Sequence, residues 1–168
     1  MPTSKNQESA YCLILGCPPS ECEAPSKFIN HGFIRFIQQS TRMRIECHLQ
    51  GLPPGEHGFH VHQSGDLSKG CSSLCSHLNP YGTTHGGRSD TKENRHVGDL
   101  GNIVVDSHGK CEMVMYDKLI SFRHETNIIG RSIVIHKNRD DLGKGGNEES
   151  LKTGNAGKRI AFGIIGRC

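Results

Sequence analysis

Metal-binding side chains are concentrated between positions 60 and 136 of this 168-residue sequence. His60 and His62 stand two positions apart, and residues with that spacing project from the same face of a β-strand. Two imidazoles placed in this way can bind one metal ion. Further metal-capable residues follow, and the whole set is His60, His62, His77, His85, His96, Asp99 and His136. Seven donors of these types are enough for two adjacent metal ions.

The set divides into a strand group and a loop group. His60 and His62 lie in a predicted strand and His136 ends another, and imidazoles on rigid strands suit copper. The loop group offers three nitrogens and one carboxylate, a tetrahedral complement that suits zinc without an open position. It consists of His77, His85, His96 and Asp99. The other histidines are expected to serve surface or packing roles, namely His31, His48, His57, His108 and His124.

Short segments of alternating polarity predict an all-β architecture. In the segment 43–50, Met43 and Ile45 share one face while Arg44 and Glu46 share the other. Eight such segments are predicted as strands, at 11–15, 32–38, 43–50, 57–63, 99–106, 110–117, 131–136 and 159–165. No segment keeps a helical period over ten residues. The strands are expected to form a sandwich or closed barrel in a single domain, residues 1–168, with a loosely ordered start at residues 1–10.

Two long segments between predicted strands have no apolar period, at 64–98 and 137–158. Loops of this length are unusual in a compact domain unless they carry function. The first loop holds His77, His85 and His96, so a role in metal binding explains it best.

Composition excludes several classes of protein. The net charge is +3, with 20 basic and 17 acidic residues that are scattered rather than clustered, so nucleic-acid binding is not expected. No apolar stretch approaches the length needed to cross a bilayer and no secretory signal is apparent, which favours a soluble cytoplasmic protein. Most of the eight cysteines are therefore expected to be free thiols.

The order and spacing of these motifs resemble the Cu/Zn superoxide dismutase family over about residues 11–166. The motifs that carry the resemblance are Gly58-Phe59-His60-Val61-His62, His85-Gly86-Gly87, Arg95-His96-Val97-Gly98-Asp99, Asp140-Asp141-Leu142-Gly143-Lys144-Gly145-Gly146-Asn147 and Lys152-Thr153-Gly154-Asn155-Ala156-Gly157-Lys158-Arg159.

The resemblance implies a Greek-key barrel of eight strands, a homodimer, superoxide as substrate and a copper chaperone as a further partner. It implies copper on His60, His62, His77 and His136, and zinc on His77, His85, His96 and Asp99. His77 would then bridge both metals through its two ring nitrogens. Asp140 corresponds to an aspartate that links a copper histidine to a zinc histidine.

The resemblance also implies the residues that handle the substrate. Arg159 corresponds to an arginine that orients a small anion beside the copper. His77 would supply a proton to the peroxide product. Lys152 and Lys144 would add positive potential that steers the anion.

Two features depart from the family pattern. The interval between His85 and His96 is about two residues longer, and 88–94 is expected to absorb the insertion without loss of the ligands. Cys71 matches a cysteine that normally ties its loop to the last strand, but Phe162 occupies the partner position. Cys75 is the nearest alternative partner and Cys168 a more distant one, while Phe162 is expected to anchor the loop by apolar contact.

Two other functions fit the same residues. A non-catalytic relative could bind metal or a copper chaperone, although the complete copper set argues against it. A barrel that uses only zinc for structure would leave His60 and His62 dispensable.

Overall fold

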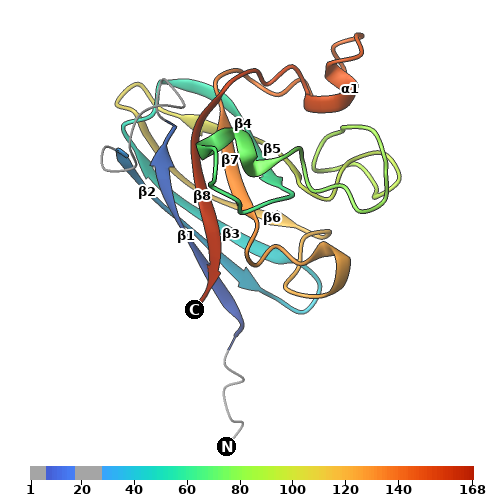
Figure 1. Ribbon diagram of the computed structural model, residues 1–168, viewed down its shortest axis with the longest axis horizontal. Helices are drawn as coiled ribbons and strands as arrows, with labels where there is room; N and C mark the ends of the chain where they lie inside the picture. The colour runs from blue at the N-terminus through green and yellow to red at the C-terminus, as the bar shows by residue number, and fades with distance from the viewer. Residues whose placement is uncertain (1–6, 18–27) are drawn as a thin grey trace, which may run out of the picture.

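The computed structural model describes residues 7–17 and 28–168 and contains one sheet of eight antiparallel strands (Figure 1). The strands are β1 Ser9–Gly16, β2 Asn30–Gln38, β3 Met43–Gln50, β4 Gly55–His62, β5 Asp99–Val105, β6 Lys110–Asp117, β7 Ser132–His136 and β8 Arg159–Arg167. Their order is β5-β4-β7-β8-β1-β2-β3-β6, and the end strands β5 and β6 face each other to give a nearly closed barrel. The predicted all-β Greek-key class is confirmed.

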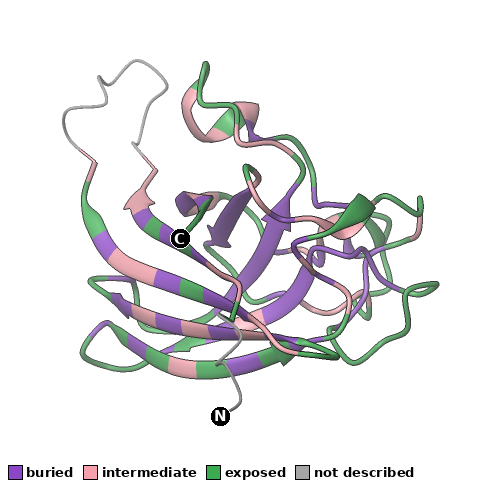
Figure 2. Cartoon of the chain, turned by 90° about the horizontal axis from the view of Figure 1, so that it is seen from below, coloured by how far each residue is buried: buried purple, intermediate pink, exposed green. Residues whose placement is uncertain are grey.

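Buried and exposed residues alternate along the strands of the barrel, as the sequence predicts. In β3 every second residue from Met43 to Leu49 is buried, and in β1 the buried residues are Ala10, Cys12 and Ile14. Figure 2 shows this alternation of buried and exposed residues along the strands. The inward-facing side chains form one apolar core.

The start of the chain is more ordered than predicted. Of the first ten residues, Ser9 and Ala10 belong to β1, where Ala10 is fully buried and pairs with Phe36 of β2. This part of the prediction is wrong because pairing on both sides fixes the strand. Of the remaining residues, Gln7 and Glu8 precede β1, and residues 1–6 lie outside the described residues. Among the described residues, no helix is long and apolar enough to span a membrane.

The two long loops emerge from neighbouring strands and meet on one side of the barrel. The loop 63–98 follows β4 and the loop 137–158 follows β7, and β4 pairs with β7. Each loop contains a short helix, a 3-10 turn at Gly70–Leu74 and α1 at Ser150–Thr153. The amide of His85 donates to the carbonyl of Leu151 at 2.8 Å and joins the loops. Because β4 and β7 are antiparallel, the two loops begin at opposite ends of this strand pair, and hydrogen bonds between the loops bring them together.

A second apolar cluster lies under the first loop. Leu74, Val134 and Phe162 are its buried members, and the Phe28 ring meets the Phe162 ring edge-on at 5.6 Å. The expectation that Phe162 anchors the loop by apolar contact is confirmed.

Close approach of β1 and β8 requires a glycine at position 163. A Cβ atom there would lie 2.1 Å from the carbonyl oxygen of Leu13 and 2.6 Å from Cys12 Sγ. We expect Gly163→Ala to lower the free energy of unfolding by about 3 kcal/mol, because the two strands must separate. Urea unfolding measures this. Gly166→Ala on the same strand is the control, since its Cβ would meet only Tyr11 O at 3.8 Å; equal losses in both variants would contradict the explanation.

Candidate metal centre

Strand pairing between β4 and β7 gathers the first group of histidines. His60 pairs with Val134 and His62 with Ser132, and their rings lie 4.9 and 5.5 Å, centroid to centroid, from the ring of His136 at the end of β7. His77 joins them through an isolated bridge to His62. All four side chains are buried, and one ring nitrogen from each lies within 4.8 Å of the others.

Hydrogen bonds to carbonyl groups fix the tautomers of two of these rings. His62 Nδ1 lies 2.8 Å from Cys75 O, and His136 Nδ1 lies 2.9 Å from Gly157 O. A carbonyl oxygen only accepts, so each Nδ1 must carry the proton and donate it. The unprotonated Nε2 atoms then face each other at 3.3 Å. Two lone pairs in this arrangement repel each other unless a cation lies between them.

Two further ring nitrogens support the same conclusion. His60 Nδ1 and His77 Nε2 are buried and have no hydrogen-bond partner among the described residues. Buried nitrogens without partners are rare because desolvation is costly. The four nitrogens therefore fit a metal ion that accepts imidazole ligands.

The second group converges on one carboxylate oxygen. Asp99 Oδ1 lies 2.8 Å from His77 Nδ1, 3.0 Å from His85 Nδ1 and 3.1 Å from His96 Nδ1. Ligands about 2.0–2.1 Å from a tetrahedral zinc are separated by roughly 3.3 Å, close to these distances. The structure brings His85 and His96 into one group, as expected despite the longer interval between them. His77 belongs to both groups, one through each ring nitrogen.

Asp140 connects the two groups. Its Oδ2 accepts from His60 Nε2 at 2.7 Å and its Oδ1 from His85 Nε2 at 2.8 Å, and the carboxylate is fully buried. Gly154, at φ 68°, is required beside it because a Cβ there would lie 1.8 Å from Asp140 Oδ1. Such hydrogen bonds fix the orientation of the ligand rings.

Burial sets the charge of the histidines. Desolvation by burial, together with the neighbouring His77 and His136, lowers the pKa of His60 well below its ordinary value. Burial likewise lowers the pKa of His136 to about 4. At His85 burial also opposes charge, but hydrogen bonds to Asp140 and Asp99 outweigh it and raise the pKa to about 9. The first group is thus neutral, the form that binds metal, while the carboxylates of Asp99 and Asp140 attract positive charge to the second group.

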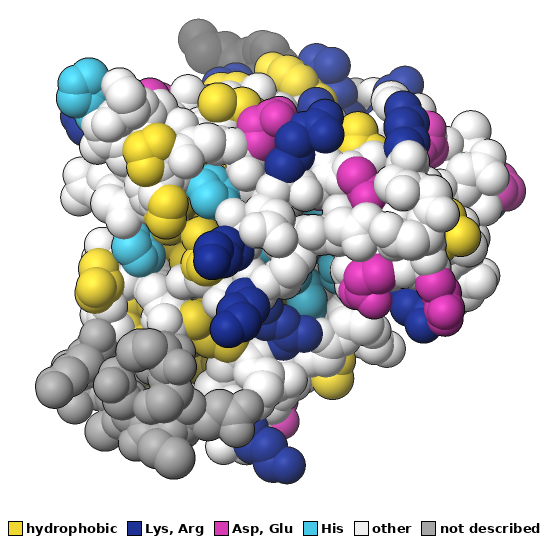
Figure 3. All heavy atoms as spheres, turned by 90° about the horizontal axis from the view of Figure 1, so that it is seen from above, with side chains coloured by type: hydrophobic (Ala, Val, Ile, Leu, Met, Phe, Trp, Pro, Cys, Tyr) yellow, Lys and Arg dark blue, Asp and Glu magenta, His cyan; other side chains and the backbone are white. Residues whose placement is uncertain are grey.

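A cleft gives access to the first group of histidines. His62, His77 and His136 lie at its wall together with Arg159 and Lys152. Figure 3 shows histidine side chains within a hollow, with basic side chains on one side and both acidic and basic side chains on the other. Lys144, the other predicted steering residue, is not among the residues that line this cleft.

Comparison with known proteins agrees with this geometry. The model of the family "Copper/zinc superoxide dismutase (SODC)" matches residues 30–165. The chain belongs to the copper/zinc superoxide dismutase family.

Relatives in this family are similar over most of their length. A superoxide dismutase [Cu-Zn] of Paramecium bursaria Chlorella virus 1 is 56% identical over 136 residues, covering 80% of this chain and 72% of that protein. An extracellular superoxide dismutase [Cu-Zn] of Brugia pahangi is 50% identical over 138 residues, covering 80% and 68%. A crystal structure of the clock protein EA4 superposes with a TM-score of 0.82 at 40% identity, covering 99% of this chain and 98% of that one.

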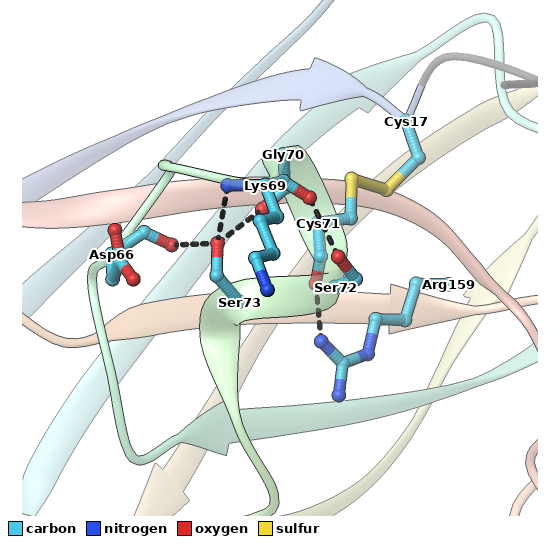
Figure 4. The surroundings of a disulfide bond; sticks show 8 residues. All are labelled: Cys17, Asp66, Lys69, Gly70, Cys71, Ser72, Ser73 and Arg159. Atoms are coloured by element: carbon cyan, nitrogen blue, oxygen red, sulfur yellow. Dashed lines mark hydrogen bonds between the residues drawn. A yellow bond between two sulfur atoms is a disulfide. The ribbon is translucent and has the colours of Figure 1, made fainter. Parts of the chain in front are cut away.

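The disulfide corrects the sequence prediction. Cys71 is bonded to Cys17, with the Cα atoms 6.2 Å apart, while Cys75 and Cys168 are free (Figure 4). The predicted partner Cys75 is therefore wrong. The physical reason is strand pairing: Leu15 of β1 pairs with Phe162 of β8, and the amide of Cys17 donates to Ile160 O at 2.8 Å. Cys17, which directly follows β1, is thus held next to the segment of β8 that contains Phe162.

The bonded loop holds Arg159. Its Nη1 donates to the carbonyl of Cys71, as Figure 4 shows, and its Nη2 donates to the carbonyl of Cys75. Half-burial lowers the pKa of Arg159, but a guanidinium stays charged. The disulfide therefore fixes the loop whose carbonyls hold this cation.

Sequence reasoning missed Cys17 and the backbone of Cys75. The carbonyl of Cys75 accepts from both His62 and Arg159, so it joins a candidate ligand to the candidate anion-binding group. The signal for Cys17 was present, since it follows a predicted strand by two residues. No residue pattern identifies a backbone carbonyl acceptor.

Removal of the Cys17–Cys71 bond should destabilise the chain. The bond closes a loop between residues 54 apart, so Cys17→Ser should lower the free energy of unfolding by about 4 kcal/mol through the greater entropy of the unfolded chain. Urea unfolding under oxidising conditions measures the loss. Cys71→Ser should lose the same amount and Cys168→Ser nothing. A loss in Cys75→Ser with none in Cys17→Ser would contradict the pairing.

The backbone of Cys75 should be strained. Its φ of 63° and ψ of −156° lie in a region that only glycine adopts readily. We expect Cys75→Gly to raise the free energy of unfolding by about 1 kcal/mol, because glycine retains the carbonyl and relieves the strain. Thermal unfolding measures the gain. Cys75→Ala, which retains a Cβ, should show no gain; an equal gain in both variants would contradict the strain.

Proposed function

We propose that the chain is a superoxide dismutase, an oxidoreductase that converts two superoxide anions and two protons into oxygen and hydrogen peroxide. The observation that carries the proposal is the pair of donor groups joined by His77, of which the first borders a cleft that is also lined by Arg159. The family to which the chain belongs is named for copper and zinc, and the two donor groups fit these metals.

Each metal is assigned by the chemistry of its donors. The all-nitrogen group suits copper and consists of His60, His62, His77 and His136. The group with one carboxylate suits zinc and consists of His77, His85, His96 and Asp99. When bound, copper supplies a one-electron redox couple and zinc a fixed positive charge.

The protein supplies orientation and protons. Arg159 is held by two carbonyls beside the cleft, so its guanidinium can bind and orient a small anion without first being ordered. His77 Nε2 faces the copper group and is the atom that can hold a proton and donate it to the peroxide. Asp140 keeps His60 and His85 in their ligating orientation.

Assembly and location stay predictions. The proposal retains the homodimer, a copper chaperone as partner and a cytoplasmic location. Similar relatives include proteins named extracellular, so similarity alone does not choose the compartment. Light scattering of the purified protein measures the oligomeric state, and fractionation of the producing cells measures the location.

Reconstitution with copper and zinc tests the function. We expect two metal ions per chain and rapid consumption of superoxide. His62→Ala should lower the rate more than about 100-fold, beyond the loss for a residue that only orients a ligand, and should retain zinc. Metal analysis and superoxide decay are measured on the same samples.

A surface histidine provides the matched control. His48→Ala should leave metal content and rate unchanged, because His48 pairs with Glu112 away from the cleft. Asp99→Ala should release zinc first. Two bound metals without superoxide consumption would contradict the proposal and favour a non-catalytic metal-binding protein.

A further inference from the structure

The cleft contains few charges that act on an incoming anion. Its wall carries three cations, Lys152, Lys158 and Arg159, and one anion, Glu149. Lys152 Nζ lies 2.5 Å from Glu148 Oε1, so much of its field is cancelled nearby. Glu149 remains as a negative charge, because its carboxylate only accepts a hydrogen bond from Thr153.

Lys158 differs from Lys152 in its surroundings. Its side chain is exposed at the cleft and forms no ion pair within residues 7–17 and 28–168. Its backbone is fixed, since its carbonyl accepts from the Lys137 amide at 2.7 Å and the next residue begins β8. The ammonium group is therefore a cation held on a rigid segment and left uncompensated.

We propose that Lys158 guides the anionic substrate into the cleft and toward Arg159. This rests on the proposed function and extends it to a residue outside the predicted steering pair, Lys152 and Lys144. Without Lys158, the charges of Arg159 and Glu149 would cancel at long range. With it, the cleft keeps a net positive potential, which raises the encounter rate of a small anion.

The rate constant for superoxide consumption, measured at low and high ionic strength, tests the proposal. Lys158→Gln should lower the second-order rate constant about two- to threefold at about 10 mM salt and less at about 150 mM, where screening shortens the range of the field. Lys158→Glu should lower the rate constant further, and Lys158→Arg, which keeps the positive charge, should have the wild-type rate constant. Copper and zinc contents should not change.

A distant lysine serves as the control. Lys110 at the start of β6 is exposed and does not line the cleft, so Lys110→Gln should keep the wild-type rate and salt dependence. A Lys158→Gln rate equal to that of the wild type at low salt would overturn the proposal. A loss that does not depend on ionic strength would also overturn it, because a structural effect would not be screened.

Anion binding gives a readout independent of turnover. In the copper-loaded protein, broadening of the ³¹P resonance of inorganic phosphate reports how often an anion reaches the cleft. The broadening should fall in Lys158→Gln and stay unchanged in Lys110→Gln. If the wild-type protein binds both metals but consumes no superoxide, the proposed function fails, and this measurement still decides whether Lys158 attracts anions.

Discussion

Lone pairs of buried imidazole nitrogens point at one another in the middle of this structure. The Nε2 atoms of His62 and His136 face each other at 3.3 Å, and both must lack a proton because their Nδ1 atoms donate to carbonyls. Such an arrangement is unfavourable without a cation, since the nitrogens have lost water and gained no donor. The barrel stabilises it only because pairing of β4 with β7 is fixed by the apolar core beneath.

The orientation of the His62 and His136 rings also depends on the two long loops. The carbonyls that orient these rings belong to Cys75 in one loop and Gly157 in the other, so the ligands are positioned only when both loops are in place. Asp140 adds a direct link between the two donor groups. The Cys17–Cys71 bond fixes the first loop to β1, and that loop in turn holds Arg159. Fold, loop conformation and the proposed chemistry are therefore coupled.

The proposed reaction requires little of the protein beyond the positioning of the metal ligands and of Arg159. A small anion needs an accessible metal, an oriented cation and a favourable potential, and the cleft provides a place for each. Arg159 is fixed by carbonyl groups, while Lys158 stays exposed at the wall of the cleft. One cation orients the anion and the other attracts it from a distance.

The sequence alone determined the strands and the seven metal-capable residues. Alternation of polar and apolar residues, as in β3, reflects burial directly, and the spacing of His60 and His62 follows from strand geometry. The sequence could not determine the partner of Cys71, because the pairing of Leu15 with Phe162 decides which cysteine comes within bonding distance. The sequence also could not show that the carbonyl of Cys75 accepts hydrogen bonds from both His62 and Arg159. Every residue has a carbonyl group, and only the tertiary structure determines which donors it meets.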